Sequence, residues 1–246
     1  MTPRTSIVIP VYNEGDSVLP VFDRIRESVT IPFEVLVVYD TTDDTTAPVV
    51  AAYGDDRFRG VLNTVRRGPA GAIRTGMLRS QADVIIVTMA DGCDDPALID
   101  PMTRLVERGC VIAAASRYMA GGAQVGGPFV KSTMSRTAGL LLCWVARVGT
   151  HDATNSFKAY SRAFLEEARI ESDAGFELGI ELVAKARRLR RPVGELPTIW
   201  LDRTLGASNF ALRAWLPKYL HWFFYAFGTP LDVISPTRGL ATVRAA

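Results

Sequence analysis

The stretch that decides the fold runs from Asp83 to Pro96 and reads D-V-I-I-V-T-M-A-D-G-C-D-D-P. Its first half, residues 84–89, is a mostly apolar run rich in β-branched side chains, which is typical of a strand buried in a parallel sheet. The run ends at an acidic turn that holds Asp91, Asp94 and Asp95. In open α/β sheets, ligands bind at the carboxyl ends of the strands, so this turn is a candidate site.

Carboxylate oxygens are hard ligands for divalent cations. A cation held by one or two carboxylates usually shares its remaining positions with water and with substrate phosphates. The acidic turn therefore indicates a metal site for a phosphorylated ligand. A second interpretation is open at this point, because the same residues suit a solvated acidic loop that caps the next helix.

Length and composition restrict the class of protein. A chain of 246 residues forms one large domain or two small ones and can bury a substantial core. Its apolar residues, 48%, and charged residues, 22%, are ordinary for a folded soluble protein. The formal charge of only +2 argues against a dedicated nucleic-acid binder. Three cysteines without C-x-x-C spacing favour a reducing compartment and no zinc site.

No targeting or membrane-spanning segment is expected. The N-terminus leads directly into a predicted strand, which argues against a signal peptide. No window holds about 18 uncharged apolar residues, so a transmembrane helix is not predicted. The expected location is the cytoplasm.

Strands and helices alternate along most of the chain. This alternation indicates an α/β fold with a Rossmann-like, mainly parallel sheet, right-handed crossovers and helices on both faces. The predicted strands are 6–11, 33–38, 61–65, 84–89, 111–115, 153–160 and 193–201, and the predicted helices are 18–29, 46–53, 97–108, 135–148, 176–188 and 212–227, with a further helix after the loop 66–76.

Acidic residues follow three of the predicted strands: Glu14, Asp40 and the turn at Asp91. Successive parallel strands place all three at one edge of the sheet, where one carboxylate suits a base or ribose and the others a metal on a diphosphate. The site is not a dinucleotide fingerprint, because no G-x-G-x-x-G follows the first strand and G-P-A-G-A at 68–72 has the wrong spacing. It is not a P-loop either, because no G-K-[ST] occurs.

Eight segments in this order resemble family 2 glycosyltransferases with the GT-A fold, and most closely the dolichol-phosphate (polyprenol-phosphate) mannose synthase branch. The resemblance implies a GT-A glycosyltransferase domain over residues 1–211, followed by an aromatic and basic amphipathic tail over 212–246. The segments are I-V-I-P-V-Y-N-E at 7–14, E-V-L-V-V-Y-D-T-T-D-D-T-T at 34–46, R-R-G-P-A-G-A-I-R-T-G at 66–76, the acidic turn, A-S-R-Y-M-A-G-G at 115–122, D-A-T-N-S-F-K-A-Y at 152–160, G-F-E-L-G-I-E-L at 175–182 and E-L-P-T-I-W-L-D-R-T-L-G-A-S-N-F at 195–210.

The resemblance also implies roles for individual residues. Mg²⁺ or Mn²⁺ held by the acidic turn would bind the diphosphate of a nucleotide sugar, GDP-mannose or a UDP-sugar. Arg117 and Arg136 would lie near the acceptor phosphate, and a late segment with Arg203 and Ser208 would close over the donor diphosphate. The implied nucleotide-sugar residues are Pro10, Tyr12, Glu14, Asp40, Arg66, Gly71, Arg74, Asp91, Arg203 and Ser208, and the implied catalytic residues are Asp91, Arg117, Arg136, Asp152 and Arg203.

Three departures from the family pattern bear on these roles. The usual aspartate pair after the second strand is Tyr39-Asp40 here. The usual D-x-D is shifted, so that Asp91 and Asp94 are the best metal ligands, with Asp95 as a third candidate. Asn209 stands where the family usually has a lysine, which removes a positive charge near the donor phosphates.

The implied mechanism is an inverting transfer. The metal and Arg203 would neutralise the charge that builds on the leaving nucleoside diphosphate. A polyprenyl phosphate is already anionic near neutral pH, so a strong general base is less needed, and the planar fork of Arg117 or Arg136 suits its phosphate. The alternatives are that either arginine forms a surface ion pair, that Asp152 only caps or turns the chain, and that His151 is structural.

The segment 212–227 is rich in aromatic residues and follows helical spacing. Trp215, Tyr219 and Phe223 would lie on one side of this helix, and the mixture with basic residues suits a membrane interface. Pro217 is expected to kink the helix or to start a new one. A dimer interface or a packed terminal helix is the alternative.

The leading function is therefore transfer of a hexose, mannose in the first place, to a polyprenyl phosphate at the cytoplasmic face of a membrane. A second function on the same fold uses a soluble or nucleoside acceptor in cell-wall, polysaccharide or natural-product synthesis. A third, from another class, is a non-catalytic nucleotide-sugar binding protein. Nucleic acid is not an expected partner, and a homo-oligomer is compatible with the sequence.

Overall fold

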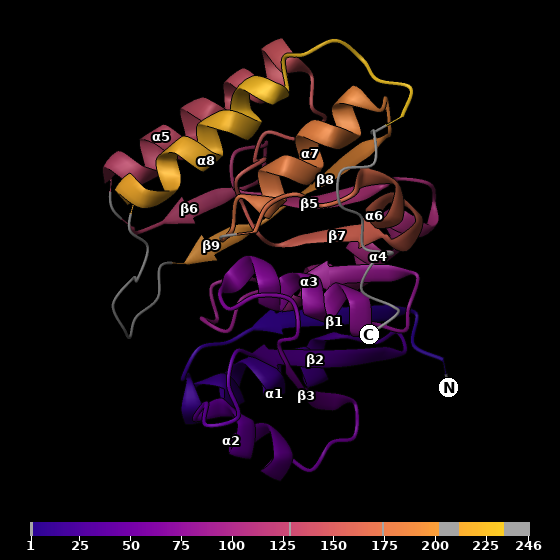
Figure 1. The fold of residues 1–246 in the computed structure, drawn as a ribbon, viewed down its shortest axis with the longest axis vertical. Helices are drawn as coiled ribbons and strands as arrows, with labels where there is room; N and C mark the ends of the chain where they lie inside the picture. Colours follow the sequence, from indigo (N-terminus) through magenta and orange to yellow (C-terminus); the bar gives the residue numbers. More distant parts are fainter. Residues whose placement is uncertain (1, 128, 174, 202–211, 234–246) are drawn as a thin grey trace.

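The computed structural model describes residues 2–127, 129–173, 175–201 and 212–233. Within these residues the chain forms a seven-stranded sheet in the order β3-β2-β1-β4-β7-β5-β8, and a two-stranded sheet of β6 and β9 (Figure 1). The strands are β1 (Thr5–Pro10), β2 (Phe33–Tyr39), β3 (Phe58–Leu62), β4 (Val84–Val87), β5 (Ile112–Ser116), β6 (Ala123–Val125), β7 (Lys158–Ser161), β8 (Val193–Pro197) and β9 (Ile199–Leu201).

Helices connect most of these strands. The α-helices are α1 (Leu19–Ser28), α2 (Thr46–Ala52), α3 (Pro69–Arg79), α4 (Ile99–Glu107), α5 (Phe129–Leu141), α6 (Arg162–Ala168), α7 (Leu178–Arg188) and α8 (Leu212–Tyr225). Two short 3₁₀ turns, η1 (Gly15–Val18) and η2 (Pro96–Leu98), precede α1 and α4, and a π-helical turn, η3 (Leu142–Ala146), extends α5.

The sheet is mainly parallel, which confirms the predicted fold class. β1 pairs in parallel with β2 and with β4, β2 with β3, and β5 with β8. Only β7 among the described strands of this sheet runs antiparallel, between β4 and β5. Because β1 lies between β2 and β4 and runs parallel to both, the chain that leaves each of these three strands emerges at one edge, as the sequence predicted.

Two of the predicted strands, 193–201 and 153–160, have different bounds in the structure. The predicted strand 193–201 is divided between β8 and β9, which belong to different sheets. Pro197 ends β8, and the N–H of Thr198 donates to the carbonyl of Ser116 before the chain pairs with β6. The predicted strand 153–160 is confined to β7, because residues 152–157 form a turn in which Asp152 accepts from the backbone of Asn155 at 3.2 Å.

Each face of the sheet is covered by its own apolar cluster. Along β2, Val35 and Val37 contribute to one cluster, whereas Leu36 and Val38 contribute to the other, as the two-residue period of a strand requires. Side chains of α1, α2 and α4 complete the first cluster, and those of α3, α6, α7 and α8 complete the second. The predicted helices on both faces are therefore present.

The helix α8 differs from the interfacial tail that the sequence suggested. It continues through Pro217, and it adds the buried Trp222 to the core that it shares with the sheet. Tyr219 and Phe223, the predicted membrane-facing side, pack against that core instead. The predicted outward orientation of Tyr219 and Phe223 was wrong, because α7 supplies an apolar surface that the tail sequence does not reveal. Phe224, on another side of the helix, is 67% exposed.

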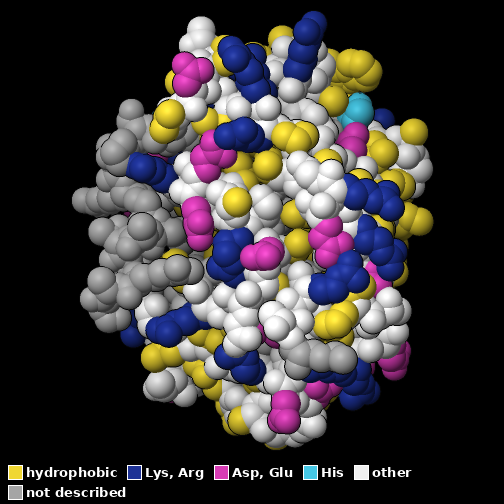
Figure 2. Space-filling view, turned by 90° about the vertical axis from the view of Figure 1, so that its right-hand side faces the viewer, with side chains coloured by type: hydrophobic (Ala, Val, Ile, Leu, Met, Phe, Trp, Pro, Cys, Tyr) yellow, Lys and Arg dark blue, Asp and Glu magenta, His cyan; other side chains and the backbone are white. Residues whose placement is uncertain are grey.

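Charge is distributed evenly over the face that Figure 2 shows. Basic and acidic side chains lie interspersed there, with apolar side chains between them, in keeping with the formal charge of +2. None of the described helices combines the length and the hydropathy needed to cross a membrane.

Candidate active site

The acidic turn follows β4 at the edge of the sheet, and its Asp94 bonds back to the residues directly after that strand. One carboxylate oxygen of Asp94 accepts hydrogen bonds from the hydroxyl of Thr88 at 2.8 Å and from the backbone N–H of Met89 at 3.2 Å. Asp94 is buried, with 9% of its surface exposed. Burial and the neighbouring carboxylate of Asp91 raise the pKa of Asp94 to about 6. The turn therefore holds two carboxylates close enough to repel each other.

The other acidic residues of the turn have different environments. Asp91 accepts a hydrogen bond from the backbone N–H of Cys93 at 3.1 Å, across the bend at Gly92, whose φ is +72°. A positive φ at this position favours glycine. Asp95 accepts from the backbone N–H of Ala97 at 3.1 Å and starts η2. The helix-capping interpretation of the turn therefore applies to Asp95.

These residues fit a divalent cation bound by two carboxylates. Among the residues that the structure describes, no group of three or more His, Cys, Asp or Glu side chains gathers into a metal cluster. A cation that also binds substrate phosphates needs only one or two protein carboxylates. Asp91 and Asp94 supply such a pair, and a cation between them would offset the repulsion that raises the pKa of Asp94. Asp95 stays a predicted third ligand.

Asp40, at the end of β2, holds the loop that follows β3. Its two carboxylate oxygens accept from the amide of Asn63 at 2.6 Å and from the backbone N–H of Gly68 at 2.7 Å. Asn63 also donates to the carbonyl of Arg66 at 2.6 Å. The sequence pointed to Asp40 but not to Asn63, since an isolated asparagine has no distinctive spacing. Contact of Asp40 with a nucleotide stays a prediction.

The predicted Pro10 ends β1, and the loop that follows carries Tyr12 and Glu14 and is bonded to the loop after β2. The N–H of Asn13 donates to the buried carboxylate of Asp44 at 3.0 Å, and the N–H of Glu14 donates to the hydroxyl of Thr46 at 3.0 Å. Sequence reasoning missed both anchoring residues, although D-D-T-T at 43–46 follows the predicted strand. Tyr12 is 68% exposed, which suits stacking on a flat ligand.

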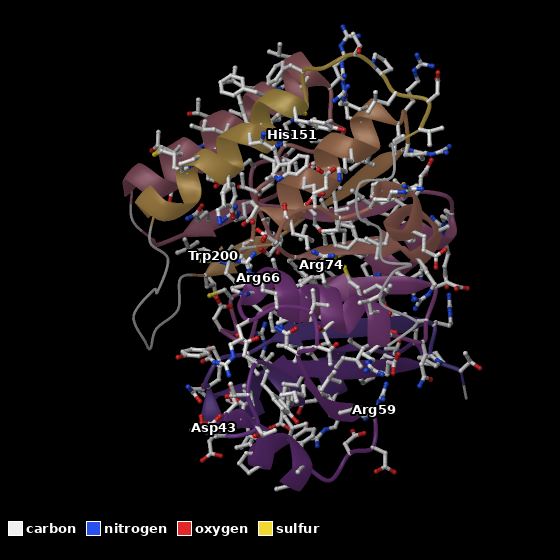
Figure 3. The ribbon with its side chains drawn as sticks, in the orientation of Figure 1. Asp43, Arg59, Arg66, Arg74, His151 and Trp200 are labelled. Carbon is white, nitrogen blue, oxygen red and sulfur yellow. The ribbon has the colours of Figure 1, made fainter. Side chains whose placement is uncertain are left out.

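The glycine-bearing loop and α3 complete this side of the site. A Cβ at Gly71 would lie 1.7 Å from the carbonyl oxygen of Arg66, so only glycine fits there. Arg74, on α3, has a buried Nε for which the described residues offer no hydrogen-bond partner. Arg66 pairs with the carboxylate of Asp173 from the loop before α7. In Figure 3 both arginines lie at the level of α3, in the middle of the molecule, and contact of either with an anionic ligand stays a prediction.

Arg117 and Asp152 form a buried ion pair close enough to the acidic turn for the charge of Arg117 to act on Asp94. The guanidinium donates to both carboxylate oxygens, at 2.6 and 2.9 Å, and the backbone N–H of Arg117 adds a third bond at 3.1 Å. The two side chains are 12% and 0% exposed. The guanidinium also lies over the rings of Tyr118 and Trp200, at 4.9 and 5.9 Å. This arrangement fits a positioning role, and direct contact of Arg117 with an acceptor stays a prediction.

Arg136 is placed differently from Arg117. It is exposed on α5, next to Ser135, which bonds to Tyr118 at 3.0 Å and to Thr154 at 2.6 Å. Burial raises the pKa of Tyr118, and the charges of Arg117 and, more weakly, Arg136 oppose that rise. Of the two predicted acceptor-side arginines, Arg136 is thus the one whose guanidinium is open to solvent.

The remaining predicted residues lie elsewhere. Arg203, Ser208 and Asn209 are outside the described residues. His151 donates its backbone N–H to Glu195 at 2.8 Å, and its Nδ1 lies 2.6 Å from the same carboxylate. This pairing ties the chain ahead of Asp152 to β8 and favours the structural interpretation of His151.

A mainly parallel sheet with an acidic turn at its carboxyl edge is the arrangement that the resemblance to GT-A glycosyltransferases implies. The comparisons with known proteins agree. The chain belongs to glycosyl transferase family 2, whose family model matches residues 6–169.

Two curated relatives and a set of solved structures are similar to the chain. It is 28% identical to a polyprenol monophosphomannose synthase of Mycolicibacterium smegmatis, over 90% of this chain and 87% of that protein. It is 25% identical to a dolichol-phosphate mannosyltransferase of Pyrococcus furiosus, over 84% of this chain and only 59% of that protein.

Glucosyl-3-phosphoglycerate synthase of Mycobacterium tuberculosis has a similar structure, with a TM-score of 0.69 and 17% identity, over 99% of this chain and 93% of that chain. The same enzyme in complex with Mn²⁺, UDP and phosphoglyceric acid gives a TM-score of 0.66 and 17% identity, over 94% of this chain and 80% of that chain. At such identity the likeness shows the fold alone.

Proposed function

We propose that this protein transfers a hexose, mannose in the first place, from a nucleotide sugar to a polyprenyl phosphate, with inversion at the sugar. The observation that carries the proposal is the similarity, over 90% of the chain, to a polyprenol monophosphomannose synthase. The similarity to a dolichol-phosphate mannosyltransferase, over 84% of the chain, supports the same acceptor class.

The donor would lie along the edge formed by β1, β2 and β4. Tyr12, Glu14 and Asp40 would contact base and ribose from the loops that Asp44 and Asn63 hold in place. The diphosphate would lie between the acidic turn and α3, within reach of Arg74, whose buried Nε is ready to donate. Binding to phosphate oxygens would satisfy that donor with a charge-assisted hydrogen bond. Arg203 and Ser208 are proposed to close over the same diphosphate.

Asp91 and Asp94 would hold Mg²⁺ or Mn²⁺ at this point, with Asp95 as a further candidate. The divalent ion supplies charge neutralisation for the leaving nucleoside diphosphate. A solved structure of the same fold contains Mn²⁺ together with UDP, which supports a divalent ion without choosing between the two metals.

The acceptor would enter from the side of α5. Arg136 would bind its phosphate, and Arg117 would be held in place by Asp152. Asp152 accepts three hydrogen bonds from Arg117, so we assign it a positioning role instead of that of a base. No strong base is required, because a phosphate monoester is already ionised near neutral pH.

Exposed apolar side chains on η3 and α8 would place this acceptor side at the cytoplasmic surface of a membrane. Trp144 is 71% exposed, Val145 61% and Phe224 67%. Arg187 brings the two segments together, because it donates to the carbonyl of Ala146 at 2.8 Å and also to that of Gly228 at the end of α8. A contact between two copies of the chain is the alternative use of this surface.

The test incubates the protein with labelled GDP-mannose or UDP-glucose, Mn²⁺ or Mg²⁺, and a polyprenyl phosphate. The expected product is labelled, extracts into organic solvent and forms only with a divalent ion. Label that stays in water and appears on a small phosphorylated acceptor such as phosphoglyceric acid would favour the soluble-acceptor function. Binding of the nucleotide sugar without turnover of any acceptor would favour the non-catalytic alternative.

A further inference from the structure

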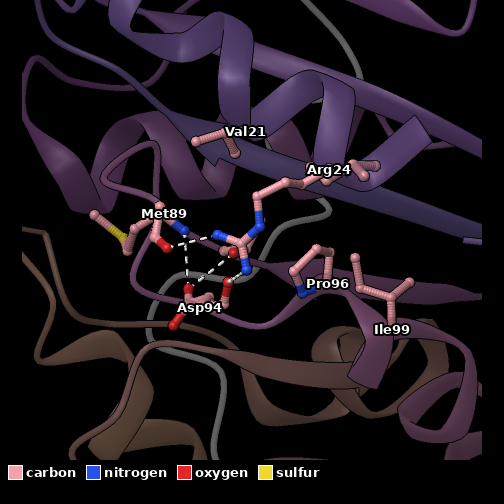
Figure 4. A pocket seen from close by; sticks show the side chains of 9 residues that line it. Val21, Arg24, Met89, Asp94, Pro96 and Ile99 are labelled. Carbon is pink, nitrogen blue, oxygen red and sulfur yellow. Dashed lines mark hydrogen bonds between the residues drawn. The ribbon is translucent and has the colours of Figure 1, made fainter. Parts of the chain in front are cut away.

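A side chain from a distant helix holds the acidic turn. Arg24, on α1, donates from Nη1 to the carbonyl oxygen of Gly92 at 2.7 Å and from Nη2 to the carbonyl oxygen of Asp94 at 3.2 Å. Figure 4 shows this guanidinium beside Asp94 and Met89, among the side chains that line a small pocket. Neither the sequence motifs nor the family resemblance assigns a role to Arg24.

The chemistry of this contact is specific to arginine. The guanidinium presents two N–H donors in a rigid plane, so it can bond to two carbonyls of one turn at the same time. The two carbonyls flank Cys93, directly beside the bend whose φ at Gly92 is +72°. The bonded turn also carries Asp91, whose carboxylate points back to the N–H of Cys93. Fixing the backbone at both sides of Cys93 therefore fixes the direction of the Asp91 and Asp94 side chains.

The contacts of Arg24 with the turn are made to its backbone. Both hydrogen bonds end on carbonyl oxygens, at Gly92 and at Asp94. The guanidinium therefore acts on the conformation of the turn and not on its carboxylates.

We propose that Arg24 is a positioning residue that holds the acidic turn in its cation-binding conformation before the metal and the donor arrive. The proposal rests on the proposed function, since it concerns the same metal site. The proposal adds a residue of α1, which lies outside the edge of the sheet. This residue acts through the backbone of the turn.

The experiment uses the buried Cys93 as a reporter in the full chain without added metal. Iodoacetamide labelling of Cys93, followed by peptide mapping, is compared in wild type, Arg24→Ala and Arg24→Lys. Cys110 and Cys143, which are partly exposed elsewhere in the fold, serve as internal references. Arg26→Ala is the matched control, because Arg26 is an exposed arginine of the same helix that pairs with Asp23 instead.

Arg24→Ala should label Cys93 about tenfold faster, a change equivalent to about 1.4 kcal/mol, with Cys110 and Cys143 unchanged. The Kd for Mn²⁺, measured by electron paramagnetic resonance titration, should rise about tenfold as well. Arg24→Lys should recover part of the Mn²⁺ affinity, because it restores the charge but not the two-pronged geometry. Arg26→Ala should match the wild type in both measurements.

Activity provides a further test, since saturating Mn²⁺ should restore kcat in Arg24→Ala if the loss is one of metal binding. The proposal would be overturned if Arg24→Ala labelled Cys93 at the wild-type rate and also bound Mn²⁺ with the wild-type affinity. Equal acceleration at all three cysteines would also overturn it, because Arg24 would then support the whole fold. A wild-type protein that binds no Mn²⁺ would refute the proposed metal site, whereas the labelling of Cys93 would still report whether Arg24 holds the turn.

Discussion

Removal of the Asp152 carboxylate tests whether the Arg117–Asp152 pair positions the site or reacts in it. The pair is almost completely shielded, with exposures of 12% for Arg117 and 0% for Asp152, so solvent screens it little. Breaking such a pair leaves an uncompensated buried charge and costs about 3–5 kcal/mol. Because each kcal/mol lowers the Tm of a chain of this size by about 2–4 °C, Asp152→Ala should lower the Tm by roughly 10 °C.

The assay combines thermal melts with a double-mutant cycle. Arg117→Leu and Asp152→Leu together should lower the Tm less than Asp152→Leu alone, because neither charge is then left unpaired. Glu107→Ala is the matched control, since Glu107 pairs with Arg4 at the surface with exposures of 35% and 47%, and its loss should cost less than about 1 kcal/mol.

Transfer activity decides between the two roles. If Asp152 only positions Arg117, activity and Tm should fall together across the cycle. An unchanged Tm for Asp152→Ala, combined with complete loss of transfer, would refute this reasoning and identify Asp152 as a residue that acts on the substrate.

Four further predictions follow from other parts of the structure. Asp91→Asn should abolish transfer without changing the Tm; activity that survives both this substitution and EDTA would exclude the metal site. Asp40→Ala should weaken nucleoside diphosphate binding by about 1–3 kcal/mol in calorimetry, because the loop it holds loses two hydrogen bonds; unchanged affinity would exclude that placement. Burial lowers the pKa of Lys158 from 10.5 to about 7. Between these two pKa values the unfolded chain binds more protons than the folded chain, so the free energy of unfolding rises with pH. Lys158→Met should therefore flatten the rise of Tm from about pH 7 to about pH 10. The double variant Leu220→Ser/Phe224→Ser, at positions 41% and 67% exposed, should reduce co-sedimentation with liposomes at constant Tm; equal sedimentation would favour a protein contact instead.

Deletion of residues 212–246 would be a less specific test of membrane binding than the two point substitutions. Trp222 lies in the core and Tyr219 packs against it, so the deletion would remove part of the fold together with the exposed face. Point substitutions on the exposed side separate membrane binding from stability. The sequence predicted that the segment is helical and aromatic, but which side of the helix faces outward depends on α7.

The sequence by itself determined the sheet and the location of the candidate site. Apolar runs such as 84–89 and the alternation with helices are local patterns, and they were sufficient to predict parallel strands and an acidic turn at their carboxyl edge. Glycine at position 71 is similarly explained by its immediate surroundings in the loop after β3. These features depend on residues that are neighbours along the chain or share one strand or turn.

Only the tertiary structure decided which side chains support the site. Arg24 reaches a turn that lies 68 residues later, Asn63 reaches Asp40 over 23 residues, and Asp152 reaches Arg117 over 35. Each contact depends on the order of the strands in the sheet and on how a helix lies against it, and sequence periodicity encodes neither. Hydrogen bonds need donor and acceptor within about 3 Å, so only the packed arrangement of distant elements determines which polar residues meet.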